Sequence, residues 1–256
     1  MTRRSILILG GTTESRQMAL NLANRSELEV TVSLAGRTTS ALAHPVPVRS
    51  GGFGGVSGLV QYVRDNRVHA LIDATHPYAA IISANARQAA ADTGTPLLTL
   101  VRPAWQPMNG DNWTEVADAT DAVRVLGARS QRVFLAMGRQ EIAAFALEPQ
   151  HHYLVRSVEP VDPPLPVPHA RYILARGPFA EADDRALLES NAIDVIVAKN
   201  SGGTATYGKI AAARALGIRV LMLRRPATPT GPTVSTVAEA VSWLDHLLTL
   251  DTPRGV

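Results

Sequence analysis

Short aliphatic runs alternate with longer stretches of mixed polarity along the chain. The short runs are rich in Ile, Val and Leu, which favour buried strands. The longer stretches place apolar residues every three to four positions, as amphipathic helices do. The pattern predicts strands over residues 5–9, 29–34, 70–73, 96–101, 113–116, 132–136, 153–158, 172–175, 195–198 and 219–223. It predicts helices over residues 14–24, 56–66, 78–92, 118–126, 179–190, 207–216 and 237–248. This βαβ spacing indicates parallel sheets covered by helices.

A break in the pattern separates the chain into two halves. Residues 103–111 contain prolines, an Asn, a Gly and an Asp, which form turns and carry little periodicity. A chain of 256 residues is near the upper size of one hydrophobic core. We therefore expect two α/β domains, residues 1–104 and 105–256, with mostly parallel sheets and a cleft between them.

Composition narrows the functional classes. The chain has no cysteine, which excludes disulfides, thiolate metal sites and a cysteine nucleophile. Its formal charge of +3 is mild and its arginines are scattered, which argues against nucleic acid as a partner. No apolar stretch is long enough to cross a membrane, so we expect a soluble, cytoplasmic protein. No cluster of metal ligands is recognisable, and the oligomeric state stays open, a monomer included.

A glycine turn follows the first predicted strand and leads into a helix. Its residues are Gly10, Gly11, Thr12, Thr13 and Glu14. Backbone N–H groups and the positive end of a helix dipole at such a turn bind anions, and glycines let a pyrophosphate approach the backbone. The run departs from the G-x-G-x-x-G pattern, because Ser15 and Arg16 stand near the place of the third glycine. The alternative is an ordinary turn in which Thr13 caps the helix.

The next strand ends in Gly36, Arg37, Thr38 and Thr39. Sites for NAD carry an acidic residue at this tip to hold the ribose hydroxyls, whereas an arginine suits the 2′-phosphate of NADP. No acid is present here, and Arg37 can form a bidentate pair with a phosphate. The tip therefore favours NADPH, unless Arg37 is only a solvated surface residue.

The strand over residues 70–73 ends in a loop with proton-carrying side chains. Ligands of open α/β sheets bind at the carboxyl ends of strands, so Ala74 and Thr75 should face the same nucleotide. His76 and Tyr78 are the side chains of this loop that could move a proton. The alternative is that both are structural, with Pro77 starting the following helix.

A corresponding loop follows the strand over residues 195–198. It begins with Lys199, Asn200, Ser201, Gly202 and Gly203. A lysine, an amide, a hydroxyl and paired glycines before a helix can hold an anion or an amide group. Arg176, at the end of another strand of this half, adds a guanidinium to the same edge. The alternative is a plain turn with Lys199 directed to solvent.

Together these runs resemble the precorrin-6A reductase family, over nearly the whole chain. The matching stretches are residues 6–14, 35–37, 51–55, 73–79, 175–179 and 199–203. The resemblance implies two Rossmann-like three-layer domains, NADPH bound to the first, and reduction of precorrin-6A to precorrin-6B in cobalamin synthesis. In that reaction a hydride adds to one carbon of the macrocycle and a proton to its neighbour.

The resemblance also implies roles for the residues named above. It assigns to the cofactor Gly10, Gly11, Thr12, Thr13, Glu14, Gly36, Arg37, Thr38, Ala74 and Thr75. It assigns to the substrate Arg176, Lys199, Asn200, Ser201, Gly202 and Gly203. The alternative for Lys199, Asn200, Ser201 and Gly202 is contact with the nicotinamide end of the cofactor. His76, Tyr78 and Lys199 are the candidates for catalysis. Arg102 and Arg139 are further cations that suit a substrate rich in carboxylates.

Other functions remain open at this stage. The residues do not distinguish precorrin-6A from the cobalt-containing substrate of the anaerobic pathway, and a non-catalytic NADP-sensing module would share the first domain. A short-chain dehydrogenase would need a Tyr-x-x-x-Lys pair, but Asn66 follows Tyr62 and Ile82 follows Tyr78 at that spacing. A methyltransferase would prefer an acidic residue where Arg37 stands.

Overall fold

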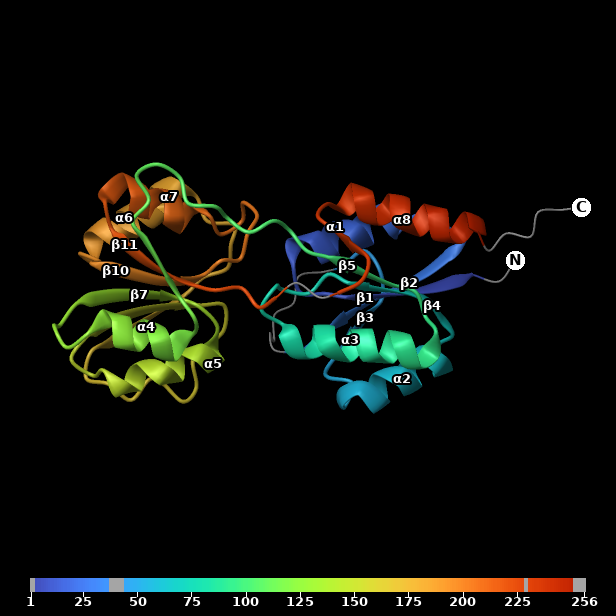
Figure 1. The fold of residues 1–256 in the computed structure, drawn as a ribbon, viewed down its shortest axis with the longest axis horizontal. Coiled ribbons are helices and arrows are strands. Elements are labelled where there is room, and N and C mark those ends of the chain that lie inside the picture. Colours follow the sequence, from blue (N-terminus) through green and yellow to red (C-terminus); the bar gives the residue numbers. More distant parts are fainter. Residues whose placement is uncertain (1–2, 37–43, 228–229, 251–256) are drawn as a thin grey trace, which may run out of the picture. The chain divides into compact units, whose positions relative to one another are not determined.

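The computed structural model, which describes residues 3–36, 44–227 and 230–250, divides into two compact units. The first combines residues 1–103 with residues 226–256, and we call it the split unit. The second, residues 104–225, is the inserted unit. Each unit is an open parallel sheet covered by helices on both faces (Figure 1).

The split unit holds a sheet of six strands in the order β12-β5-β4-β1-β2-β3, with every neighbouring pair parallel. Its elements are β1 (Arg4–Leu9), α1 (Thr13–Leu22), β2 (Leu28–Leu34), β3 (Val48–Ser50), α2 (Gly55–Asp65), β4 (Val68–Asp73), α3 (Ala80–Thr93), β5 (Leu97–Leu100), β12 (Thr233–Val234) and α8 (Val237–Leu250). The sheet is wound outward in both directions from β1 and β4, as in dinucleotide-binding folds. Ligands of such sheets bind where the winding direction reverses, at the carboxyl ends of β1 and β4.

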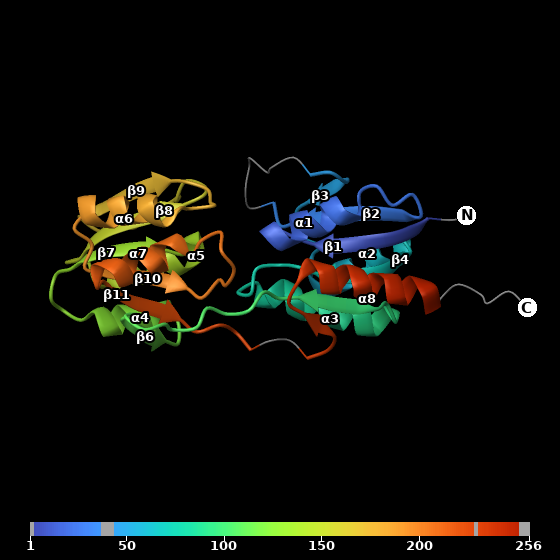
Figure 2. The same ribbon diagram turned by 90° about the horizontal axis from the view of Figure 1, so that it is seen from above.

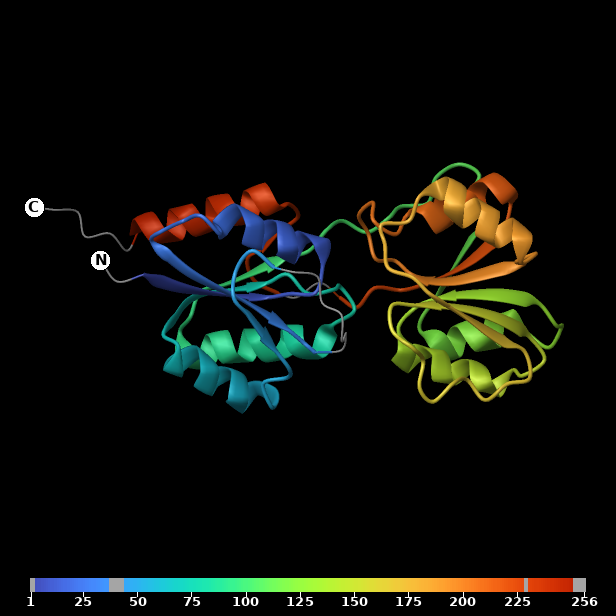
Figure 3. The ribbon, with the colours of Figure 1, turned by 180° about the vertical axis from the view of Figure 1, so that it is seen from behind.

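Two apolar layers hold the split unit together, one on each face of its sheet. Helices α1 and α8 lie side by side on one face (Figures 1 and 2), where Met18 and Leu244 are fully buried. Helices α2 and α3 cover the other face (Figure 3), around Leu59 and Ala86. The central strands are buried on both faces, which explains why their sequences are continuously aliphatic and not alternating.

The inserted unit has its own six-stranded parallel sheet, in the order β6-β11-β10-β7-β8-β9. Its elements are β6 (Trp113–Val116), α4 (Ala119–Leu126), β7 (Arg132–Ala136), α5 (Arg139–Ile142), the 3-10 helix η1 (Ala143–Leu147), β8 (His152–Ser157), β9 (Ala170–Leu174), α6 (Glu181–Ser190), β10 (Val195–Lys199), α7 (Gly208–Leu216) and β11 (Arg219–Leu223). From β7 the chain adds β8 and β9 on one side, and it then returns to place β10 on the other. The point of reversal, and hence the expected ligand edge, lies at the carboxyl ends of β7 and β10.

Helices cover both faces of this sheet as well. Helices α6 and α7 pack on one face, where Phe134, Leu188 and Ile210 are fully buried (Figure 1). Helix α4 and the α5–η1 segment lie on the other face, with Phe145 fully buried.

The predicted α/β class with two Rossmann-like parallel sheets is confirmed. The predicted second domain, residues 105–256, is wrong for its last part, because residues 226–256 belong to the split unit. Strand β12 extends the first sheet beside β5, and Ala240, Leu244 and Leu248 of α8 complete its core. The short elements β3, α5, η1 and β12 are additions to the predicted pattern.

The structure also bears on the predicted start of the third helix and on membrane-spanning segments. Helix α3 begins at Ala80, so Tyr78 lies in the loop before it and not in the predicted helix over residues 78–92. Pro77 lies in the same loop and does not start the helix. Over the described ranges of the chain, no helix is long and apolar enough to cross a membrane.

Candidate functional site

The glycine turn lies at the carboxyl end of β1, beside the point where the split unit's sheet reverses direction. Gly11 has a φ of +114°, which side chains disfavour, and a Cβ built there would meet no atom within 4 Å. The backbone conformation at position 11 therefore requires glycine, and the space above this residue is open. Gly10 differs, since a Cβ there would lie 3.0 Å from Val32 Cγ1 and 3.1 Å from Ser15 Oγ. Gly10 thus allows the turn to pack closely on β2 and α1.

Thr12 caps helix α1, and not Thr13 as the alternative of an ordinary turn had it. Its Oγ1 accepts a hydrogen bond of 3.1 Å from the N–H of Ser15. The Ser15 hydroxyl in turn accepts from the N–H groups of Gly11 and Thr12, each at 3.1 Å. Ser15 is fully buried and occupies the place of the third fingerprint glycine. A small buried side chain therefore serves the close packing for which that glycine is usually required.

The capping arrangement limits which N–H groups can meet an anion. The N–H groups of Gly11 and Thr12 already donate to the Ser15 hydroxyl. The N–H groups of Thr13 and Glu14, in the first turn of α1, have no intrahelical acceptor by helix geometry, and the helix dipole places positive potential there. Among residues 10–14, the first turn of α1 and the open surface of Gly11 therefore offer the geometry that an anion needs.

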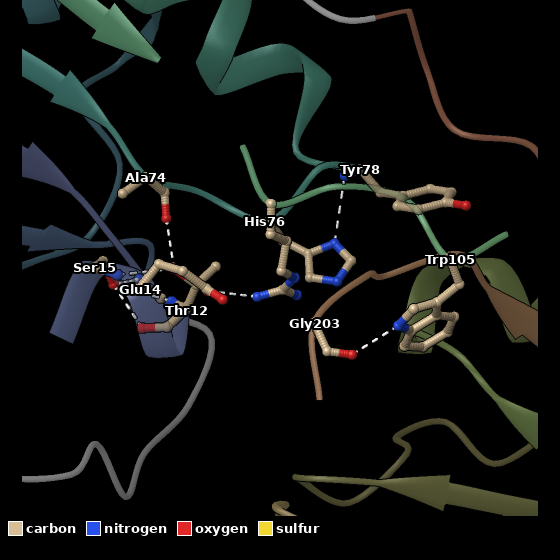
Figure 4. Close-up of polar contacts among 10 residues, drawn as sticks. Thr12, Glu14, Ser15, Ala74, His76, Tyr78, Trp105 and Gly203 are labelled. Atoms are coloured by element: carbon tan, nitrogen blue, oxygen red, sulfur yellow. Dashed lines mark hydrogen bonds and ion pairs between the residues drawn. The ribbon is translucent and has the colours of Figure 1, made fainter. Parts of the chain in front are cut away.

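Glu14 and Arg102 form an ion pair at this edge. The Arg102 Nη1 atom lies 2.5 Å from Glu14 Oε2, and the two side chains are 15% and 23% exposed. Arg102 was predicted as a cation for substrate carboxylates, but in the structure its charge is partly compensated by Glu14 (Figure 4). The pair connects the start of α1 to the segment that follows β5.

The predicted ribose-phosphate tip is described only up to Gly36. Gly36 has a φ of +70° and is exposed, and a Cβ there would lie 3.1 Å from Ser50 Oγ. The turn after β2 therefore needs glycine on both conformational and steric grounds. Arg37, Thr38 and Thr39 lie outside the described residues.

A hydrogen bond joins the glycine turn to the loop after β4. Thr12 Oγ1 donates to the carbonyl of Ala74 at 2.7 Å (Figure 4). In the same loop, Asp73 is 2% exposed, and its Oδ1 accepts from the N–H of Thr75 at 3.1 Å and from the Thr75 hydroxyl at 2.7 Å. Ala74 and Thr75 are thereby fixed at the reversal point of the sheet.

His76 and Tyr78 lie close together in this loop. Their ring centroids are 5.6 Å apart, and the N–H of Tyr78 donates to His76 Nδ1 at 3.3 Å (Figure 4). Because Nδ1 accepts a hydrogen bond, the neutral imidazole carries its proton on Nε2. His76 also lines a cavity of about 50 Å³ together with Asp73, Thr75 and Ser83. The two predicted proton carriers are thus brought together by the structure.

Lys199 ends β10 at the reversal point of the inserted unit. It forms an ion pair with Glu141 of α5, which follows the neighbouring strand β7. Lys199 is 14% exposed and Glu141 is 32% exposed. Gly138 makes room for the pair, because a Cβ there would lie 2.6 Å from Glu141 Oε2. Glu141 was not among the predicted site residues.

Trp105 fixes the loop that begins at Lys199. Its N–H donates to Asn200 Oδ1 at 2.8 Å, and the Asn200 amide donates to the Trp105 carbonyl at 2.9 Å. Its indole Nε1 donates to the carbonyl of Gly203 at 2.7 Å (Figure 4). Asn200 therefore has a structural task in addition to its predicted contact with substrate. Gly202 and Gly203 have φ of +67° and +66°, so both glycines are needed by the turn itself.

The remaining predicted residues lie at the same edge of the inserted unit or outside what the structure describes. Arg176 is exposed after the end of β9, and Ser201 is half-buried next to Asn200. The side chain of Arg139 is not described. Within residues 3–36, 44–227 and 230–250, no group of three or more His, Cys, Asp or Glu side chains could hold a metal ion.

Comparison with known proteins gives consistent results. Residues 5–245 match the family model described as precorrin-6x reductase CbiJ/CobK. A precorrin-6A reductase of Sinorhizobium sp. is 54% identical over 97% of this chain and 95% of its own. One from Rhodobacter capsulatus is 48% identical over the full length of both chains.

A more distant relative and a solved structure complete the comparison. A cobalt-precorrin-6A reductase of Priestia megaterium is 29% identical over 93% of this chain and 97% of its own. A solved structure described as CobK precorrin-6A reductase superposes with a TM-score of 0.92 at 46% identity, covering 99% of this chain and 100% of that one.

Proposed function

Because the chain belongs to the precorrin-6x reductase family, we propose that it reduces precorrin-6A to precorrin-6B with NADPH as the hydride donor. Family membership makes it an oxidoreductase that reduces a double bond of the precorrin-6A macrocycle in cobalamin biosynthesis. The identities of 48% and 54% to precorrin-6A reductases, against 29% to a cobalt-precorrin-6A reductase, favour the cobalt-free substrate.

The observation that carries the cofactor proposal is the turn at the split unit's reversal point. The open space above Gly11 and the first turn of α1 fit a pyrophosphate, and Gly36, after the end of β2, is followed in the sequence by Arg37. A guanidinium there suits a 2′-phosphate and disfavours the NAD pattern. When bound, NADPH supplies the hydride for the reduction.

The residues of the chain bind and orient the reactants and provide protons. The Thr12–Ala74 hydrogen bond fixes the two strand tips between which the nucleotide is held. His76 presents its proton on Nε2 and Tyr78 a phenolic proton, and both are our candidates for protonating the carbon next to the reduced one. Lys199, Ser201 and Arg176 provide the cations and the hydroxyl for the carboxylates of the substrate.

A nucleotide titration tests the cofactor proposal. We expect NADPH to bind more tightly than NADH to the wild-type protein. Arg37→Ala should weaken NADPH binding about 10- to 100-fold, because a charged hydrogen-bonded pair contributes about that much. The affinity for NADH should stay unchanged. Arg64→Ala is the matched control, because Arg64 lies at the end of α2, away from the strand tips. Addition of precorrin-6A should then oxidise NADPH. If neither nucleotide binds, the assignment of the turn is wrong; if NADPH binds without turnover, a nucleotide-sensing role gains weight.

A further inference from the structure

Lys209 is a buried cation in the first turn of α7 that the functional proposal does not use. The chain has two lysines, Lys199 and Lys209. Lys209 is only 3% exposed. Its Nζ donates to the carbonyl of Thr206 at 2.6 Å and lies 5.0 Å from the centre of the Trp105 ring. An ammonium over an indole face is attracted by the ring, so two independent contacts fix this amine.

Lys209 and Trp105 together act on the loop at residues 199–207. Trp105 bonds Asn200 and Gly203 near the start of the loop, and Lys209 bonds Thr206 near its end. The two side chains also contact each other through the ring. Trp105 and Lys209 thus anchor the loop at three positions, Asn200, Gly203 and Thr206.

The surroundings of Lys209 leave little room for another arrangement. At Gly208, a Cβ would lie 2.8 Å from the carbonyl of Phe179 and 3.0 Å from Asp184 Oδ2. The start of α7 is therefore pressed against the segment before α6. The charged groups that act on Lys209 are Arg156 from β8 and Asp184 from α6, which form a buried ion pair.

We propose that Lys209 is a positioning residue for the reduction: with Trp105 it holds the loop at residues 199–207 in the arrangement that receives the substrate, and it does so as an ammonium. This inference rests on the proposed substrate role of that loop. The ammonium donates a charge-assisted hydrogen bond to Thr206 and interacts with the Trp105 ring, and both interactions weaken when the proton is lost.

The charge of Lys209 should change near neutrality. Burial, and after it the Arg156 guanidinium, lowers the pKa of Lys209 from 10.5 to about 7, against the attraction of Asp184. The loop is therefore held most firmly below pH 7 and less firmly above it.

Fluorescence of the protein without nucleotide or substrate tests the contact itself. The emission of Trp105, taken as the difference between the wild type and Trp105→Phe, should titrate with a midpoint near pH 7 and lose this titration in Lys209→Met. A Trp105 signal that is the same in the wild type and in Lys209→Met throughout the range from pH 5.5 to 9 overturns the proposal. This measurement does not depend on the proposed function.

Steady-state kinetics test the consequence. Lys209→Met should raise the KM for precorrin-6A at least fivefold at pH 6.5 and leave the Kd for NADPH unchanged, because the nucleotide is assigned to the split unit. The wild-type KM should rise between pH 6.5 and 8.5, and Lys209→Arg, which keeps its charge, should abolish that rise. A KM in Lys209→Met equal to the wild-type value at both pH values overturns the positioning role. If the wild type does not turn over precorrin-6A while Trp105 still titrates, the proposed function fails and the Lys209 contact stands.

Discussion

Thr12 donates a 2.7 Å hydrogen bond to the carbonyl of Ala74 while its oxygen accepts from the N–H of Ser15. One hydroxyl therefore caps α1 and joins the tips of β1 and β4. Both interactions lie at the edge where the split unit's sheet reverses direction.

Thr12→Val should lower both stability and nucleotide affinity. Loss of an N-cap costs about 1 kcal/mol, and loss of the second hydrogen bond adds a similar amount. We expect the free energy of unfolding to fall by about 2 kcal/mol and the Kd for NADPH to rise several-fold, because the two strand tips are no longer fixed to each other. Denaturant unfolding and fluorescence titration measure these effects. Thr12→Ser, which keeps the hydroxyl, should stay close to the wild type; an equal loss in both variants would contradict the role of the hydroxyl.

Gly11→Ala should affect the nucleotide more than the fold. The φ of +114° makes any side chain strained, at a cost of about 1–3 kcal/mol. Gly231, with a φ of +121° and equally open space, offers a matched control in the same unit. Gly11→Ala and Gly231→Ala should lower the Tm by similar amounts, but only Gly11→Ala should weaken NADPH binding about tenfold or more. Equal nucleotide affinities in the two variants would remove Gly11 from the binding surface.

Glu141→Gln should impair turnover without affecting nucleotide binding. It removes the charge that orients Lys199, and a charged hydrogen bond of this kind contributes about 1.5–3 kcal/mol. We expect kcat/KM for precorrin-6A to fall about tenfold. Glu115→Gln is the control, because its pair with Arg224 is exposed on both sides and lies in the same unit. Steady-state kinetics that showed no difference between the two variants would make the Lys199–Glu141 pair a structural one.

His151 should contribute to the pH dependence of stability on the acid side. Burial lowers the pKa of His151 below its ordinary 6.5, although Glu148 acts in the opposite direction. Below pH 6.5 the unfolded chain therefore binds a proton that the folded chain resists, and stability is lost as pH falls towards the folded pKa. His151→Asn keeps an acceptor for the N–H of Gln131 and removes the titration. The difference in unfolding free energy between pH 7.5 and 5.5 should shrink in this variant; an unchanged difference would exclude His151 as a source.

The fold was predictable wherever a strand is buried on both faces. Continuous aliphatic runs such as residues 6–9 and 195–198 fixed most strands of both sheets. The short edge strands β3 and β12 have two or three residues and too little apolar signal to stand out. The assignment of α8 also lay beyond the pattern, because an amphipathic helix does not by itself specify which sheet it covers. In the structure, Ala240, Leu244 and Leu248 pack into the first core.

The sequence indicates candidate site residues where they lie at strand ends, and it does not indicate side chains that reach them from other segments. Lys199 ends β10, and His76 and Tyr78 lie in the loop that follows β4. Trp105 and Glu141 lie in a connecting segment and a short helix, so only the three-dimensional structure brings them to Asn200 and Lys199. Lys209 is buried in the first turn of α7, which the sequence did not indicate.

The discontinuity of the split unit has a consequence for synthesis on the ribosome. When residue 103 has been made, the sheet face that carries Ile6, Ile8 and Ile72 still lacks the helix that will cover part of it. That helix, α8, is translated only after the whole inserted unit. The nascent chain must therefore carry an incomplete split unit while the inserted unit folds, and such exposed apolar surface attracts chaperones or aggregates. A message truncated before α8 should yield not half an enzyme but an insoluble product.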